Sequence, residues 1–211
     1  PASSLRFYRS RSSNYNGESN FTSAVSATTN SLAWLGNGSV QGSLPPGSIN
    51  GAVSALLRQS DGKIVIAGSF TNILGKARKY IARLLPDLTL DLSFDPMVSA
   101  SSPITQIQPV ANGGIYIFGS FSTVNGVARN DIARLTSSGE LDATFNTNTK
   151  WTFSDGIRVQ ADGKLIVFGD FQTFLGAPSD FIARLNLDGS IDTSFDGFPG
   201  WQLDAVAVQP N

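Results

Sequence analysis

Three arginine–aspartate couples are the most chemically suggestive residues of this sequence. Each arginine stands in an Ile-Ala-Arg-Leu segment, and an aspartate follows eight residues later: Arg83 with Asp91, Arg134 with Asp142, and Arg184 with Asp192. Three arginines could line an anionic site, whereas an Arg–Asp pair between a strand and the following turn satisfies both charges without a ligand. An N-terminal copy of the segment has Trp34 and Gln41 at these two positions, as expected for a pair that is lost together. The sequence therefore favours structural pairing.

Cysteine and histidine, the residues of many catalytic centres, are both absent. Their absence excludes thiol nucleophiles, Ser–His and Cys–His dyads, disulfides and the usual zinc ligand sets. Glutamate occurs only at Glu18 and Glu140, and no pair of carboxylates departs from the repeating pattern. We therefore expect no catalytic residue, no metal ligand set and no cofactor.

The segment from Asn186 to Asp192, Asn-x-Asp-Gly-x-x-Asp, faintly resembles a calcium loop. It lacks the alternating carboxylates and the terminal glutamate of an EF-hand. The corresponding segments beginning at Pro86 and Ser137 would not bind the same ion. An Asx turn is the favoured interpretation.

Three tryptophans are the candidate ligand-binding residues. Trp151 and Trp201 fall about one repeat apart at the start of a predicted strand, and Trp34 stands in the N-terminal copy. Exposed aromatic side chains on one face of a repeat domain could stack on sugar rings or insert into a partner protein. The alternative, that Trp151 and Trp201 plug the mouth of a narrow ring, is favoured.

The elements that must position these residues repeat with a period of about 50 residues, in the range of propeller blades and solenoids. Each copy contains Gly-x-Phe, a further glycine, Ile-Ala-Arg-Leu and Asp-x-x-Phe, in that order. The recurring rings are Phe70, Phe121 and Phe171, and then Phe94, Phe145 and Phe195. These rings could form a ligand-stacking ladder, but recurrence at one place in every copy is typical of core packing between blades. We predict that they are structural.

Each copy contains four short segments with strand character. In the first complete copy they are residues 52–59, 63–70, 80–85 and 89–94, of which the second is continuously apolar, as in a strand buried on both faces. Scarce Glu and Lys and plentiful Gly, Ser, Thr, Asn and Asp disfavour helices. Four antiparallel strands in about 50 residues describe a propeller blade. The sequence thus predicts an all-β, β-propeller-like repeat domain.

The sequence predicts a single domain with five consecutive parts. These are a partial N-terminal blade with an irregular extension at 1–46, three repeats at 47–96, 97–146 and 147–196, and the first strand of a further or closing blade at 197–211. The N- and C-terminal strands could share a fourth blade, and such closure would remove exposed edges. Alternatively, both ends are cuts through a longer array.

The pattern from Asp61 to Phe70 and from Asp162 to Phe171, followed by Ile-Ala-Arg-Leu and the segment from Asp188 to Phe195, resembles the delta-60 repeat, a β-propeller repeat family. The resemblance covers residues 47–211 and part of 31–46. It implies a propeller without an assigned catalytic site. It also implies a place in large exported or cell-surface bacterial proteins or in phage structural proteins.

Charge and hydropathy limit the partners. The net charge is −1 without a long basic run, so we expect no nucleic-acid partner. No apolar segment reaches the about 20 residues that span a bilayer, so we expect no direct membrane insertion. We predict a non-catalytic structural or protein-interaction module on an extracellular, cell or virion surface. A carbohydrate- or receptor-binding propeller is the alternative, and a propeller enzyme is the least favoured.

Overall fold

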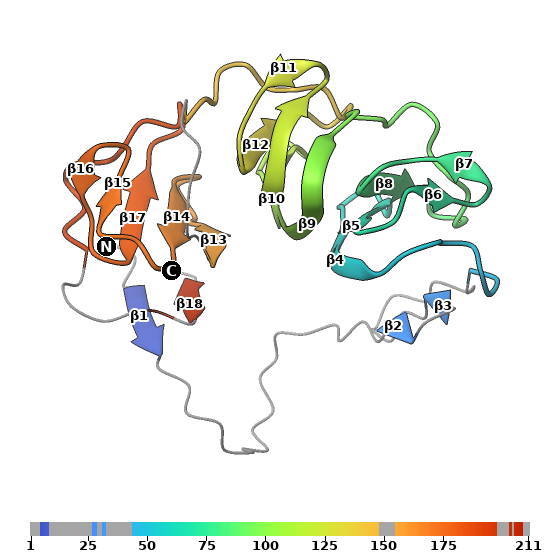
Figure 1. Ribbon diagram of the computed structural model, residues 1–211, viewed down its shortest axis with the longest axis horizontal. Coiled ribbons are helices and arrows are strands. Elements are labelled where there is room, and N and C mark those ends of the chain that lie inside the picture. Colours follow the sequence, from blue (N-terminus) through green and yellow to red (C-terminus); the bar gives the residue numbers. More distant parts are fainter. Residues whose placement is uncertain are drawn as a thin grey trace.

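The structure is a computed structural model that describes residues 5–8, 27–28, 31–32, 44–147, 155–197, 203 and 205–208. All regular elements in these ranges are β-strands, so none of them contains a helix that could cross a membrane. Three antiparallel sheets follow one another in an arc, as expected for consecutive propeller blades (Figure 1). The predicted all-β, propeller-like class is confirmed.

Each sheet has three main strands, which meander in sequence order from the inner side of the arc outward. The first blade contains β4 (Val53–Arg58), β5 (Ile64–Gly68) and β8 (Ile81–Leu84); the second contains β9 (Ser99–Pro109), β10 (Ile115–Val124) and β12 (Ile132–Leu135); the third contains β13 (Gly156–Val159), β14 (Leu165–Phe168) and β17 (Ile182–Leu185). The register is equivalent in all three, since the first residue of the middle strand pairs with the Leu of Ile-Ala-Arg-Leu.

The fourth predicted strand of each blade is shorter than expected. It contributes a single β-bridge per blade: Leu84 to Leu90, Leu135 to Leu141, and Leu185 to Ile191. The reason lies in the aspartate that follows the bridge. Asp91 Oδ1 accepts hydrogen bonds from the backbone N and Oγ of Ser93, and the backbone N of Phe94 bonds to the Asp91 carbonyl, so the chain turns away from the sheet.

A small hairpin that the sequence analysis did not predict follows each middle strand. The hairpin strands are β6 (Asn72–Ile73) with β7 (Lys76–Ala77), the end of β10 with β11 (Val127–Ala128), and β15 (Thr173–Phe174) with β16 (Ala177–Pro178). Two residues with positive φ connect them, Leu74 and Gly75 in the first blade, at 50° and 74°. Two left-handed residues are the signature of a type I′ turn, whose twist matches that of the strands.

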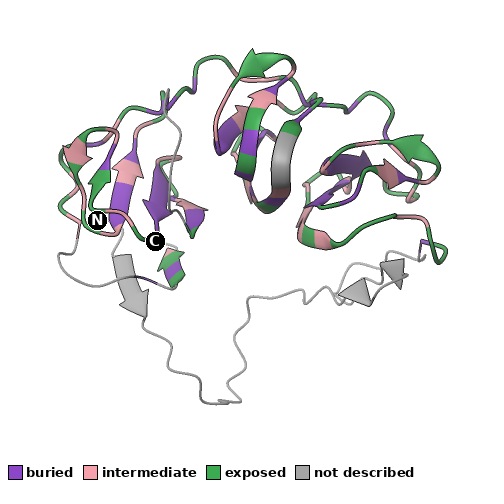
Figure 2. Ribbon diagram, in the orientation of Figure 1, coloured by how far each residue is buried: buried purple, intermediate pink, exposed green. Residues whose placement is uncertain are grey.

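The middle strands β5, β10 and β14 are buried on both faces, because a cluster of apolar side chains packs on each face. In β5, Val65 and Ala67 pack against the second blade, whereas Ile64 and Ile66 belong to a separate cluster on the opposite side. In β10, Ile115 and Ile117 face the first blade, whereas Tyr116 and Phe118 face the third blade. In β14, Leu165 and Val167 face the second blade, whereas Ile166 and Phe168 face the side of β18. Figure 2 shows β8 and β14 buried, while the hairpin strands β7 and β11 are exposed.

Strands from the two ends of the sequence pair with each other. β1 (Leu5–Tyr8) is antiparallel to β18 (Ala205–Val208), next to the third blade in Figure 1, and Val206 joins the cluster of Ile166 and Phe168. This is a pairing that the sequence predicted for a shared blade. β3 (Ser31–Leu32) forms a local hairpin with β2 (Ala27–Thr28), and the rest of the predicted N-terminal copy up to Ser43 lies outside the described residues.

Candidate functional site

Each of the predicted Arg–Asp pairs is formed, at the junction of the third strand and the following turn. The arginine Nε donates to the aspartate Oδ2 at 2.8 Å from Arg83 to Asp91, at 2.7 Å from Arg134 to Asp142, and at 2.7 Å from Arg184 to Asp192. In the first blade, Nη2 also lies 2.8 Å from the same oxygen, and both side chains are more than nine-tenths buried. The pair is therefore shielded from water most completely in the first blade.

The phenylalanine that ends each copy covers the guanidinium. The Cζ atom of the arginine lies 4.4 Å from the ring centroid of Phe94, 5.3 Å from that of Phe145 and 4.8 Å from that of Phe195. A cation over an aromatic face is attracted by the ring quadrupole. These rings therefore serve both packing and charge stabilisation, and this second role was not predicted.

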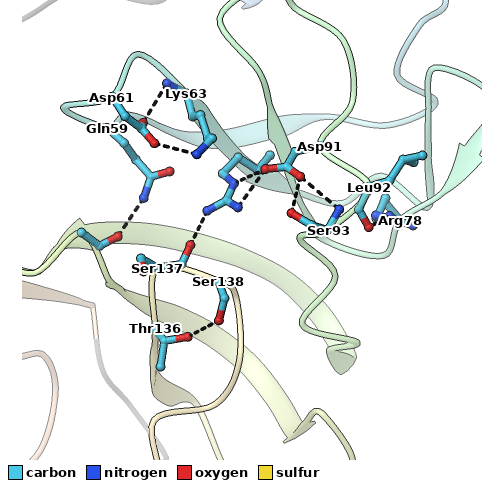
Figure 3. Close-up of polar contacts among 12 residues, drawn as sticks. Gln59, Asp61, Lys63, Arg78, Asp91, Leu92, Ser93, Thr136, Ser137 and Ser138 are labelled. Carbon is cyan, nitrogen blue, oxygen red and sulfur yellow. Dashed lines mark hydrogen bonds and ion pairs between the residues drawn. The ribbon is translucent and has the colours of Figure 1, made fainter.

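The same arginines connect neighbouring blades. Figure 3 shows the guanidinium that bonds to Asp91 reaching the Ser137 carbonyl on the turn of the second blade. The Nη1 of Arg134 donates to the Leu187 carbonyl of the third blade at 2.7 Å. We call this network, the three Arg–Asp pairs with these two carbonyls, the polar seam. It joins the turns of the second and third blades to the outer strand of the preceding blade.

Two glycines allow neighbouring blades to approach closely enough for the polar seam to form. Gly139 and Gly189 occupy the turns that carry the acceptor carbonyls, with φ of +94° and +89°. A Cβ on Gly139 would lie 2.7 Å from the Phe94 ring, and one on Gly189 would lie 2.8 Å from the backbone of Asn146. A side chain at either position would push neighbouring blades apart. The first blade, which has no preceding blade among the described residues, has Leu88 at this place with φ of 67°.

The seam holds its carboxylates in the charged form. Burial alone would raise the pKa of Asp91, but hydrogen bonds from Ser93 and Arg83 outweigh it and lower the pKa. Asp142 behaves in the same way. The pKa of Asp192 is lowered furthest, first by the hydrogen bond from Lys164 Nζ at 2.7 Å and then by Ser194.

This geometry gives the seam no open reactive group. In the first blade, both oxygens of Asp91 accept hydrogen bonds, from Arg83 on one side and Ser93 on the other. A carboxylate with a lowered pKa and two engaged oxygens is poorly suited to general acid or base chemistry. In the described ranges, no group of three or more acidic residues, cysteines or histidines could hold a metal ion.

The other sequence-predicted residues divide into three groups. Phe70 and Phe121 are buried in the core, while Phe171 is half-buried and packs 5.1 Å from the Phe174 ring. The predicted Asx turn is confirmed, since Asp188 Oδ1 accepts the backbone N–H of Ser190 at 2.9 Å. Trp34, Trp151 and Trp201 lie outside the described residues.

A second connection between blades involves a residue that sequence reasoning missed. Gln106 of β9 donates through Nε2 to the Asp155 carbonyl at 3.0 Å and accepts at Oε1 from the backbone N of Ile157. A Cβ at Gly156 would lie 2.6 Å from that Nε2, so glycine permits the approach. The sequence signal for this contact was Gln106 itself, a polar residue at the position where the other copies have Ala55 and Gly156.

Three segments of the chain, residues 59–94, 111–145 and 160–195, match the β-propeller domain of unknown function DUF5122. Together they cover half of the sequence, and each spans one blade from the turn after its inner strand to the phenylalanine of the seam. The chain therefore belongs to this family of β-propeller repeats. No significant match was found among curated proteins.

Proposed function

We propose that the protein is a non-catalytic structural or protein-interaction module that acts on an extracellular, cell or virion surface. The observation that carries this proposal is the saturation of the polar seam. The charged residues that repeat in every blade bind one another and the backbone of the next blade. Their chemistry stabilises the arc, so recognition falls to the surface positions that differ between blades.

The partner expected from this proposal is a protein or a surface assembly. Exposed hairpins along the arc, such as β7 and β11, offer positions that vary freely without disturbing the core. The polar seam meanwhile keeps neighbouring blades in register. This combination suits a scaffold that presents loops to a partner.

Cross-linking on the intact source cell or particle tests the proposal. A membrane-impermeant amine-reactive cross-linker should label the exposed Lys76 and Lys79 and give defined cross-links to one or a few proteins, identified by mass spectrometry. Absence of labelling on intact material, with labelling after lysis, would contradict the surface assignment. Labelling without any cross-linked protein would contradict the interaction module.

A further inference from the structure

A second arginine position, on the outer side of the blades, differs between copies. Arg78 follows hairpin strand β7 in the first blade, and its side chain is only 11% exposed. Its guanidinium donates to the Ala77 carbonyl at 2.9 Å and the Leu92 carbonyl at 3.3 Å, and lies 3.1 Å from Asp95 Oδ2. Three acceptors on two segments thus hold one guanidinium; Figure 3 shows Arg78 beside Leu92.

The second blade fills the same position with its own arginine. Arg129 follows β11, and its Nη1 donates to the Ala128 carbonyl at 2.7 Å, as Arg78 does to Ala77. The backbone of the two residues is held alike, because Arg129 N bonds to the Ser122 carbonyl and Arg78 N to the Thr71 carbonyl. Two blades therefore use an internal guanidinium here.

The third blade has no arginine at the position of Arg78 and Arg129. Ser179 stands there, and its backbone N bonds to the Gln172 carbonyl at 3.0 Å, equivalent to the bond of Arg78. The repeat places Pro178, Thr193 and Asp196 where the three acceptors of Arg78 stand in the first blade. A cleft of about 190 Å³ opens beside Ser179 and is lined by Pro178 and Asp196 among others. The volume of the cleft is several times the volume of about 30 Å³ that one water molecule occupies in the liquid.

The charge of the cleft favours a cation. Its lining includes Asp180, Asp192 and Asp196, against the single guanidinium of Arg184. Asp192 and Arg184 already pair with each other, whereas Asp180 and Asp196 are exposed and form no ion pair with any described residue. Both could therefore meet an incoming positive charge.

We propose that the cleft of the third blade binds an arginine side chain of a partner protein, in the place where the first blade holds Arg78. The molecule itself supplies the template, since two blades show a guanidinium at this position. Separate backbone and carboxylate acceptors suit the planar, forked donor set of arginine better than the single ammonium of lysine. The inference rests on the proposed function, because the arginine comes from a protein partner.

Titration of the full chain with N-acetylarginine amide, followed by ¹H–¹⁵N NMR, tests the cleft. We expect saturable shifts centred on the amides of Ser179, Asp180 and Gly197, with N-acetyllysine amide binding several-fold more weakly. Asp196→Asn should weaken arginine binding about tenfold, and Ser179→Arg should abolish it by filling the cleft. Asp95→Asn, the matched change in the first blade, should leave binding unchanged. No saturable shift, or wild-type binding by folded Ser179→Arg, would overturn the proposal.

The cross-linking experiment separates the cleft from the broader function. If Asp196→Asn lowers the yield of the partner cross-links in parallel with probe binding, the cleft is a partner site. Wild-type cross-linking by Asp196→Asn would reject the cleft and keep the interaction module. Absence of cross-links from the wild-type protein would reject the module, even if the probe binds.

Discussion

The first and third blades carry the same Arg–Asp pair in different surroundings. In the first blade, Arg83 and Asp91 are almost fully buried, and the arginine also reaches the next blade. In the third blade, Arg184 is 21% exposed, and no described residue of a following blade accepts from it. Lys164 supplies a second positive charge to Asp192 there.

This difference shows how the same pair is accommodated at two places in the arc. In the first and second blades, a carbonyl of the next blade accepts from the arginine Nη1. In the third blade, Lys164 adds a second cation to Asp192, while Ser194 bonds to this aspartate as Ser93 does to Asp91 in the first blade. The outer position also differs, since the first blade has Arg78 there and the third has Ser179. The repeat therefore keeps the Arg–Asp pair in every blade and varies the groups around it.

The largest expected contrast concerns the rings of the seam. Phe94 is 1% exposed, so Phe94→Ala should destabilise the protein by about 3 to 5 kcal/mol through lost burial and the cavity left behind. Phe195 is only half-buried, and Phe195→Ala should cost less, about 1 to 2 kcal/mol, in proportion to the smaller buried area. Urea unfolding followed by fluorescence measures both. Equal costs would contradict the proposed difference between the first and third blades.

Removing the arginine tests the same contrast at the charged pair. Arg83→Ala leaves Asp91 buried and without its cation, and should cost about 3 to 5 kcal/mol. Arg184→Ala leaves Asp192 paired with Lys164, so the cost should be about 1 to 2 kcal/mol. Chemical denaturation gives both values. A larger loss of stability for Arg184→Ala than for Arg83→Ala would contradict the compensating role of Lys164.

Glycines distinguish the seam from the hairpins. Gly139→Ala combines a left-handed φ with a contact to Phe94, and should cost about 2 to 3 kcal/mol. Gly75→Ala also has positive φ, 74°, but meets nothing within 4 Å, so it should cost about 1 kcal/mol. Thermal and urea unfolding of the two variants provide the comparison. Similar costs would mean that the Gly139 turn is not packed against Phe94.

Acid stability sharpens the role of Lys164. The pKa of Asp192 is lowered in the fold from its ordinary value of 3.8, chiefly by the hydrogen bond from Lys164. Its stabilisation is therefore complete above the unfolded pKa and is lost as pH falls through the lower folded pKa. Lys164→Met should raise the folded pKa, reduce stability at neutral pH and move the midpoint of acid unfolding to higher pH.

The matched change in the first blade is Lys63→Met. Lys63 bonds to the exposed Asp61 and not to the seam, so the shift of the acid midpoint should be smaller. Circular dichroism between neutral pH and about pH 2 measures both midpoints. An equal shift for the two variants would contradict the special position of Lys164.

The sequence predicted those parts of the fold that depend on local pattern. The apolar run at 63–70 contains β5, because apolar clusters pack on both faces of this strand. The spacing of Arg83 and Asp91 predicted their pair. The strand predicted at 89–94 is a single bridge, because the Asx turn at Asp91 competes with the ladder.

Features that depend on stacking could not be predicted. The bond from Arg83 to Ser137 joins residues of two blades and needs the distance between sheets, which no single repeat encodes. The hairpin turn of the first blade places Leu74 at positive φ, against its usual preference. Only the second blade, with Asn125 and Gly126, carries the usual Asn-Gly signal of such a turn.

The central claim is that the Arg–Asp pairs of the seam are structural and act as units. The most direct test is a double-mutant cycle for Arg83→Ala and Asp91→Ala, measured as free energy of unfolding in urea, with Arg184→Ala and Asp192→Ala as the matched cycle. We predict a coupling energy of about 1 to 3 kcal/mol for the first pair and a smaller one for the second. Additive single-mutant effects at Arg83 and Asp91 would contradict the claim.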